Sequence, residues 1–142
     1  MNMRNSPLSL RTPHSKTGMV FGVFDGLHDG HKHILIEAKK HCEKLIVVVT
    51  LDTVVSILKS HPPKYSYEER TKAIADFNPN LVIVPSDPTL GGWSILDRHQ
   101  PDMIFLGYDQ HAIASDLKRM NRSFRTIDPY HPETFHSSIL NT

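Results

Sequence analysis

Short apolar runs alternate with amphipathic segments along most of the chain. The runs cover residues 19–23, 45–51, 81–84, 103–106 and, more weakly, 124–127. They are rich in Val and Ile without polar alternation, which is typical of strands buried on both faces of a parallel sheet. Apolar residues recur at helical spacing in the segments 32–42, 67–77, 94–99 and 113–120. The order strand, helix, strand predicts an α/β fold.

Five such strands predict a single Rossmann-like, doubly wound domain with a parallel sheet of order 3-2-1-4-5. Right-handed crossovers then place helices on both faces of the sheet. Ligands of these sheets bind beyond the carboxyl ends of the strands, where the winding direction reverses between strands 1 and 4. The loops that follow these strands, residues 22–33 and 107–110, are therefore candidate walls of a binding site.

The first 16 residues differ in composition from the rest of the chain. They contain Arg4, Arg11 and Lys16 and no acidic residue, and they are rich in Ser, Pro and Asn. We expect a disordered arm over residues 1–16, followed by one domain over residues 17–142. A weak organelle-targeting segment is the alternative interpretation of this arm.

Composition excludes several classes of protein. The formal net charge of +1 and the 39% hydrophobic content are ordinary for a soluble globular protein and give no case for nucleic-acid binding. No apolar run approaches the roughly 20 residues that a membrane span needs. A single cysteine, Cys42, excludes an internal disulfide framework and a multi-cysteine zinc site, and it fits a cytoplasmic location.

The stretch GVFDGLHDGHKH, residues 22–33, combines glycines with three histidines at the expected start of a helix. A helix that begins near Gly30 points free backbone N–H groups and its positive dipole end at the loop, and Asp29 can cap it. His28 and His31 are three residues apart, and each imidazole has an N–H group to donate. We predict a site for phosphate oxygens. A metal site and exposed surface histidines are the alternatives, and His33 is expected to be exposed.

Four motifs resemble one known family. GVFDGLHDGH is similar to the G-x-F-D-x-x-H-x-G-H signature of the cytidylyltransferase-like nucleotidyltransferases, which include glycerol-3-phosphate cytidylyltransferase, phosphopantetheine adenylyltransferase and FAD synthases. SYEER, residues 66–70, resembles a segment of the glycerol-3-phosphate enzyme. FLGYDQ, residues 105–110, resembles the strand-4 segment of archaeal FAD synthases. FHSSIL, residues 135–140, is similar to the family's closing segment at a helix start.

The resemblance implies transfer of CMP or AMP from CTP or ATP to a phosphorylated small-molecule alcohol, with release of pyrophosphate. It also implies Mg²⁺ bound with the triphosphate and a homodimer. A catalytically weak nucleotide-binding or sensor protein of the same fold is the alternative. Two departures suggest it: Val23 replaces a Thr of the glycerol-3-phosphate enzyme, and His131 replaces an arginine of its closing segment.

The resemblance implies catalytic roles for His28, His31, Lys59 and Arg70. The two histidines would stabilise the α-phosphate and the leaving group. Lys59 would hold phosphates, with Lys64 as the second candidate, although Lys59 could equally be a solvated helix end. Arg70 would contact an anionic partner, because a cation early in a helix opposes the dipole; an ion pair with a neighbouring acid is the alternative.

The expected nucleotide-binding residues come from three segments. They are Gly22, Val23, Phe24, Asp25 and Gly30 in the first loop, Gly107, Asp109 and Gln110 in the second, and His131, Phe135, Ser137 and Ser138 near the end. Asp25 is expected to bond loop backbone and Phe24 to pack in the core. Asp109 and Gln110 could read the base or the ribose, but Asp109 could instead cap a helix. The two serines would donate to the β- and γ-phosphates, or form a cap.

Overall fold

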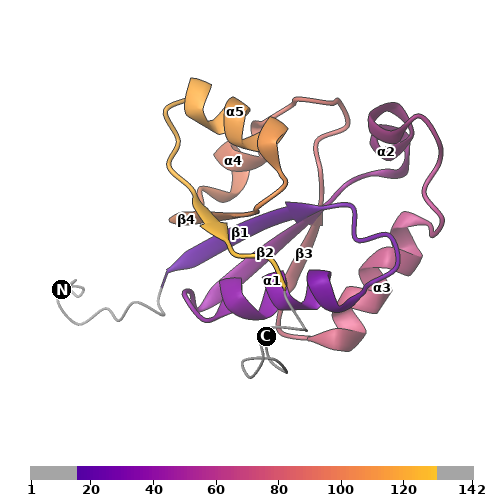
Figure 1. Ribbon diagram of the computed structural model, residues 1–142, viewed down its shortest axis with the longest axis horizontal. Coiled ribbons are helices and arrows are strands. Elements are labelled where there is room, and N and C mark those ends of the chain that lie inside the picture. Colours follow the sequence, from indigo (N-terminus) through magenta and orange to yellow (C-terminus); the bar gives the residue numbers. More distant parts are fainter. Residues whose placement is uncertain (1–15, 131–142) are drawn as a thin grey trace, which may run out of the picture.

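The computed structural model describes residues 16–130, which form a five-stranded parallel sheet between two layers of helices (Figure 1). The strands are β1 (Thr17–Gly22), β2 (Lys44–Val49), β3 (Val82–Pro85), β4 (Met103–Gly107) and β5 (Arg125–Ile127). Their order is β3-β2-β1-β4-β5, and every neighbouring pair is parallel. The predicted fold and strand order are confirmed.

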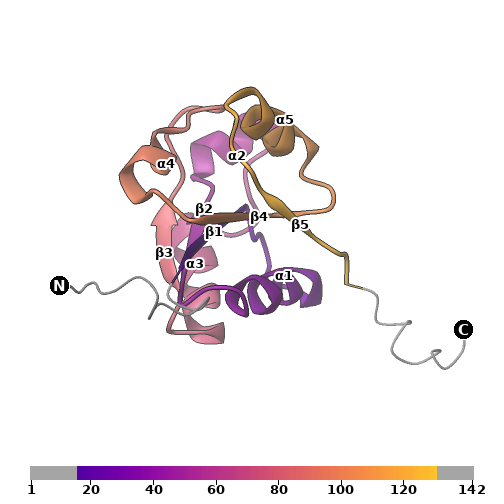
Figure 2. The ribbon, with the colours of Figure 1, turned by 90° about the vertical axis from the view of Figure 1, so that its left-hand side faces the viewer.

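The helices are α1 (Asp29–Lys39), α2 (Asp52–Lys59), α3 (Tyr67–Phe77), α4 (Ser94–His99) and α5 (His111–Arg119). Figure 2 shows α1 and α3 on one face of the sheet and α4 and α5 on the other. Four helices match the amphipathic segments, although α1 begins and ends three residues earlier than expected. Helix α2 lies outside those segments, and it buries only Val54 and Val55, so its apolar signal is short.

Each central strand is apolar because it packs on both faces. In β1, Met19 and Phe21 join a cluster that includes residues of α4 and α5. Val20 between them joins a second cluster with residues of α1 and α3. Alternate side chains of a strand point to opposite faces, so a strand covered on both sides must be apolar at every position.

The pairing between β1 and β4 is short. It joins Gly18 to Met103 and Met19 to Ile104, whereas β4 pairs with β5 over Phe105–Gly107. Beyond Met19, β1 is therefore paired in the strand ladder with β2 alone. The winding direction of the sheet reverses between these two strands, as predicted, and the loops after β1 and β4 both begin there.

Within residues 16–130 no helix is long and apolar enough to cross a membrane. The expected arm at residues 1–16 lies outside the described residues except for Lys16. The candidate site residues His131, Phe135, Ser137 and Ser138 also lie outside them.

Candidate functional site

The loop after β1 turns sharply and buries Phe24. A Cβ atom on Gly22 would lie 2.7 Å from the Phe24 ring, so a larger residue does not fit there. Phe24 adopts a φ of 53° and is only 4% exposed, in agreement with its expected core role. Its ring meets the His31 ring edge-on, with the centroids 5.3 Å apart. Phe24 therefore supports His31 from the core side.

His28 and His31 cap α1 reciprocally. Nδ1 of His28 accepts hydrogen bonds from the backbone N–H groups of Gly30 at 3.1 Å and His31 at 3.4 Å. Nδ1 of His31 accepts one from the N–H of His28 at 3.3 Å. The two rings stack with centroids 3.6 Å apart. Because each Nδ1 is an acceptor, a neutral ring carries its proton on Nε2.

This geometry corrects two expectations. The N-cap of α1 is His28, and Asp29 is the first helical residue, so Asp29 does not cap the helix. The N–H groups of Gly30 and His31 are bonded to the His28 ring and are not free for an anion. The ring nitrogen that remains as a donor on each histidine is therefore Nε2.

The His31 ring is held in its neutral form. Burial lowers its pKa to about 4, and the neighbouring His28 acts in the same direction. A hydrogen bond to the Gly26 backbone and the charges of Asp109 and Asp25 oppose this shift and are weaker. At neutral pH His31 is therefore an uncharged hydrogen-bond donor.

Asp25 joins the histidine loop to the segment before α3. Its two carboxylate oxygens accept hydrogen bonds from the backbone N–H groups of Lys64 at 2.7 Å and Tyr65 at 2.9 Å. Slight burial raises the Asp25 pKa, but these two hydrogen bonds and the charges of Arg70 and Lys64 together outweigh it, and the pKa lies below its ordinary value. Both oxygens bond backbone, as the structural interpretation of Asp25 expects.

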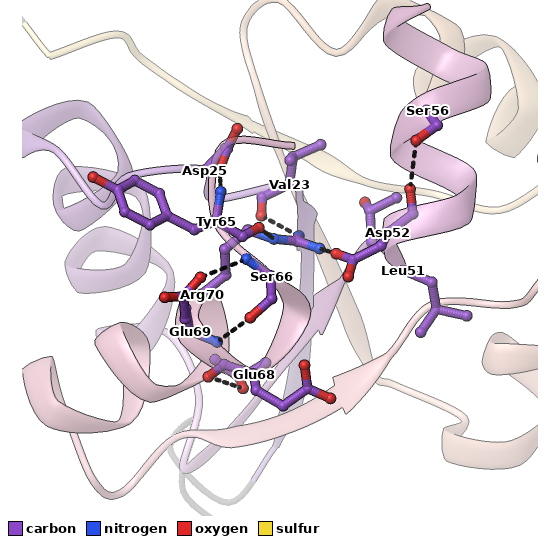
Figure 3. Close-up of polar contacts among 12 residues, drawn as sticks. Val23, Asp25, Leu51, Asp52, Ser56, Tyr65, Ser66, Glu68, Glu69 and Arg70 are labelled. Atoms are coloured by element: carbon purple, nitrogen blue, oxygen red, sulfur yellow. Dashed lines mark hydrogen bonds and ion pairs between the residues drawn. The ribbon is translucent and has the colours of Figure 1, made fainter. Parts of the chain in front are cut away.

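Arg70 does not lie where a phosphate could contact it. Its side chain is fully buried and forms an ion pair with Asp52, with Nη2 and Oδ1 2.6 Å apart. Nη1 donates to the carbonyl of Val23 at 2.8 Å, and Nε donates to the carbonyl of Tyr65 at 3.0 Å (Figure 3). The expected direct role is therefore replaced by the alternative, an ion pair with an acid. That acid is on α2.

The two candidate lysines have different surroundings. Lys59 is exposed at the last residue of α2, which agrees with a solvated helix end. Lys64 is also exposed, but its backbone is bonded to Asp25, and its charge contributes to lowering the Asp25 pKa. The geometry therefore places Lys64 beside the histidine loop.

The loop after β4 is tied to β1 by Gln110. The Gln110 Oε1 atom accepts from the N–H of Gly107 at 2.8 Å, and its Nε2 donates to the carbonyl of Phe21 at 2.9 Å. The amide thus bonds backbone on both sides, and its expected role in reading a base or ribose is not supported by this geometry. Asp109 is exposed and does not cap α5, whose N-cap is Gln110. The bond from Gln110 to Phe21 brings the start of this loop against the end of β1.

His33 is not simply exposed, contrary to expectation. Its ring is partly buried, and its Nε2 lies 3.0 Å from the carbonyl oxygen of Asp128. His33 therefore links α1 to the segment that follows β5.

Two contributors were not found from the sequence. Asp52 and Tyr65 complete the contacts of Arg70. The sequence feature that could have indicated Asp52 is its position three residues after β2, at the carboxyl end of the sheet. Tyr65 contributes only backbone groups to these bonds, which leave no trace in residue type. Within residues 16–130 no group of three or more His, Cys, Asp or Glu side chains could hold a metal ion.

Comparison with known proteins adds the family context. A family model described as cytidylyltransferase-like matches residues 19–137. The chain is 38% identical over 108 residues to the FAD synthase of Pyrococcus horikoshii, and the aligned region covers 74% of this chain and 71% of the relative. It is 35% identical over 125 residues to the FAD synthase of Thermococcus sibiricus, covering 85% of this chain and 83% of the relative.

Two solved structures have a similar fold. A lipopolysaccharide core biosynthesis protein from Thermoplasma volcanium superposes with a TM-score of 0.66 at 28% identity, over 82% of this chain and 98% of that one. A bifunctional NMN adenylyltransferase/ADP ribose pyrophosphatase from Francisella tularensis gives a TM-score of 0.58 at 16% identity, over 89% of this chain and 43% of that one. The second likeness concerns the fold alone.

Proposed function

Because the chain belongs to the cytidylyltransferase-like family and is therefore a nucleotidyltransferase, we propose that it transfers AMP from ATP to FMN, forming FAD and pyrophosphate. The observation that carries the choice of substrates is the likeness to two FAD synthases at 35–38% identity over most of both chains. The segment FLGYDQ at residues 105–110 points in the same direction.

The reaction needs placement and donors more than protein nucleophiles. A phosphate oxygen of FMN attacks the α-phosphorus of ATP, and the bond from that phosphorus to the bridging oxygen of the β-phosphate breaks. Negative charge grows on the α-phosphate oxygens and on the departing pyrophosphate. Donors that are already in position stabilise this charge without reorganising during the step.

The histidine pair supplies such donors in the proposed mechanism. Each Nδ1 is occupied by a backbone N–H group, so Nε2–H is the donor of each neutral ring; that of His31 would leave the Gly26 backbone to bind the ligand. Without ligand His31 is neutral, because its pKa is about 4. In this proposal it acts as a hydrogen-bond donor to the phosphates.

A lysine and the segment near the end of the sequence supply the other phosphate contacts in this proposal. Lys64 is our choice for the phosphate lysine because its backbone is bonded to the histidine loop, with Lys59 as the second candidate. His131, Phe135, Ser137 and Ser138 keep their expected nucleotide-binding roles as part of this proposal.

Mg²⁺ would arrive with the triphosphate. Mg²⁺ at nucleotide sites typically takes its ligands from phosphate oxygens, water and one or two carboxylates. Both oxygens of Asp25 already accept backbone hydrogen bonds, so we do not assign this carboxylate as a ligand of the cation. The histidine N–H groups of the same loop would bind the phosphates. When bound, the ion would neutralise part of the triphosphate charge.

Incubation with Mg²⁺ and two substrate pairs tests the proposal. We expect ATP with FMN to yield FAD and pyrophosphate, detected by chromatography, and CTP with glycerol 3-phosphate to yield no product. The second pair is included because SYEER at residues 66–70 resembles the glycerol-3-phosphate enzyme. Product from the CTP pair alone would overturn the choice of substrates, and binding without turnover would favour the sensor alternative.

The state of the protein in solution is also open to test. We propose a cytoplasmic homodimer. Sedimentation equilibrium should give about twice the 16.1 kDa mass of the chain, and a monomer at micromolar concentration would contradict this part.

A further inference from the structure

Arg70 joins three segments that are distant in sequence. Its guanidinium contacts the carbonyl of Val23 in the loop after β1, the carbonyl of Tyr65 before α3, and the carboxylate of Asp52 in α2. The side chain is fully buried, whereas 45% of the Asp52 side chain is exposed. All three contacts meet at the carboxyl end of the sheet, as Figure 3 shows.

The Tyr65 backbone is held from both sides. Its N–H donates to Asp25, and its carbonyl accepts from Arg70. The preceding N–H, that of Lys64, donates to the other oxygen of Asp25. Because Asp25 and Val23 belong to the histidine loop, two side chains of opposite charge bind residues 64–65 to that loop.

Stability alone does not account for this arrangement. A buried arginine must be paired and hydrogen-bonded, and such a pair is often no more stabilising than apolar residues of similar size. Its planar group with donors in fixed directions is suited to setting the relative positions of three backbone segments. The segment that it places carries Lys64, which is exposed and whose backbone is bonded to Asp25 of the histidine loop.

We infer that Arg70 and Asp52 are positioning residues that set the distance between Lys64 and the histidine pair, and thereby nucleotide affinity. The inference rests on the proposed function in requiring a triphosphate at the histidine loop. Neither residue touches the ligand; each acts through Lys64. Loss of the Asp52 carboxylate frees the guanidinium to turn away from Val23 and Tyr65, and Asp25 alone then holds the backbone of residues 64–65 against the loop.

A double-mutant cycle on the full chain tests this coupling. The variants are Asp52→Ala, Lys64→Ala and the combination of the two. Calorimetric titration with a non-hydrolysable ATP analogue and Mg²⁺ measures affinity without the acceptor. Asp52 is suited to substitution because it is partly exposed, whereas Arg70→Met leaves a buried site unfilled. The control is Asp76→Asn, which breaks the exposed Lys72–Asp76 ion pair of α3.

We expect Lys64→Ala to weaken binding about 10-fold, the scale of one charge-assisted contact. Asp52→Ala should weaken it several-fold, and the double variant should bind no more weakly than Lys64→Ala alone, because the two changes remove the same contact. The control should bind as the parent does. Melting curves of all variants show whether each remains folded.

Two results would overturn the inference: unchanged affinity in Asp52→Ala, or a double variant whose loss equals the product of the single losses. A parent chain that binds the analogue but forms no FAD would contradict the proposed function and leave the inference standing. A parent chain that binds no nucleoside triphosphate would overturn both.

Discussion

The two nitrogens of His28 are assigned different tasks, and substitution can separate them. Nδ1 caps α1 by accepting from Gly30 and His31, whereas Nε2–H is the proposed phosphate donor. His28→Asn should keep the cap, because an Asn oxygen reaches the same N–H groups and Asn is among the best N-cap residues. It should lose the donor, because the side chain is too short to reach the position of Nε2.

The two effects have different magnitudes. Loss of the cap costs about 1 kcal/mol in free energy of unfolding, and a domain of this size then melts about 4 °C lower. Loss of one positioned donor slows turnover about 100-fold, which corresponds to about 2.7 kcal/mol in activation free energy. We therefore expect His28→Asn to melt close to the parent temperature with about 100-fold lower kcat, and His28→Ala to show both losses.

Steady-state FAD formation and thermal melting of the same preparations measure the two quantities. His99→Asn, at the last residue of α4, is the matched control and should keep both activity and melting temperature. Two outcomes would refute the reasoning: parental kcat in His28→Asn, or equal melting temperatures for His28→Asn and His28→Ala. The first would remove the donor role, and the second would remove the cap.

Three further outcomes are expected. The folded His31 pKa of about 4 lies below the ordinary 6.5, so the unfolded chain takes up a proton first and stability should fall as the pH drops from about 6.5 to about 4. For a fully buried ring this pKa difference would lower the free energy of unfolding by about 3 kcal/mol, and partial exposure reduces the effect to about 1 kcal/mol. Urea unfolding at pH 7 and 4.5 should show this decrease in the parent and a smaller one in His31→Gln. Gln110→Ala leaves the N–H of Gly107 and the carbonyl of Phe21 without the partners seen here and should lower the free energy of unfolding by about 1–3 kcal/mol, whereas unchanged urea unfolding would show that water replaces the amide. The double variant Ser137→Ala and Ser138→Ala should raise the dissociation constant for ATP if both bind phosphates, but should only lower stability by about 1 kcal/mol if they form a cap, so calorimetry beside melting curves distinguishes the two roles.

The sheet could be predicted from the sequence because its central strands are covered on both faces. Residues 45–49 and 103–106 carry unbroken apolar runs, and this pattern has few interpretations when helical segments lie between the runs. Helix α2 was harder to predict because only Val54 and Val55 face the interior.

The site was predictable in position but less so in its hydrogen bonds. The histidine spacing and its place after β1 identified the loop. The residue types could not show that His28, rather than Asp29, caps α1, because both are able to accept N–H groups. The partner of Arg70 was also hidden, since Asp52 is 18 positions away and meets it only through the fold. Long-range pairs of this kind depend on topology rather than on local spacing.

The short pairing between β1 and β4 has a consequence for how this chain can change length. Beyond Met19 the carbonyl of Phe21 has no partner from β4 in the strand ladder, and the side-chain amide of Gln110 bonds it instead. The same amide must also reach back three residues to the N–H of Gly107. An insertion or deletion between residues 107 and 110 would leave one of these two backbone groups out of reach. Homologues that diverge widely elsewhere should therefore keep this turn at constant length, with a side-chain amide at its last position.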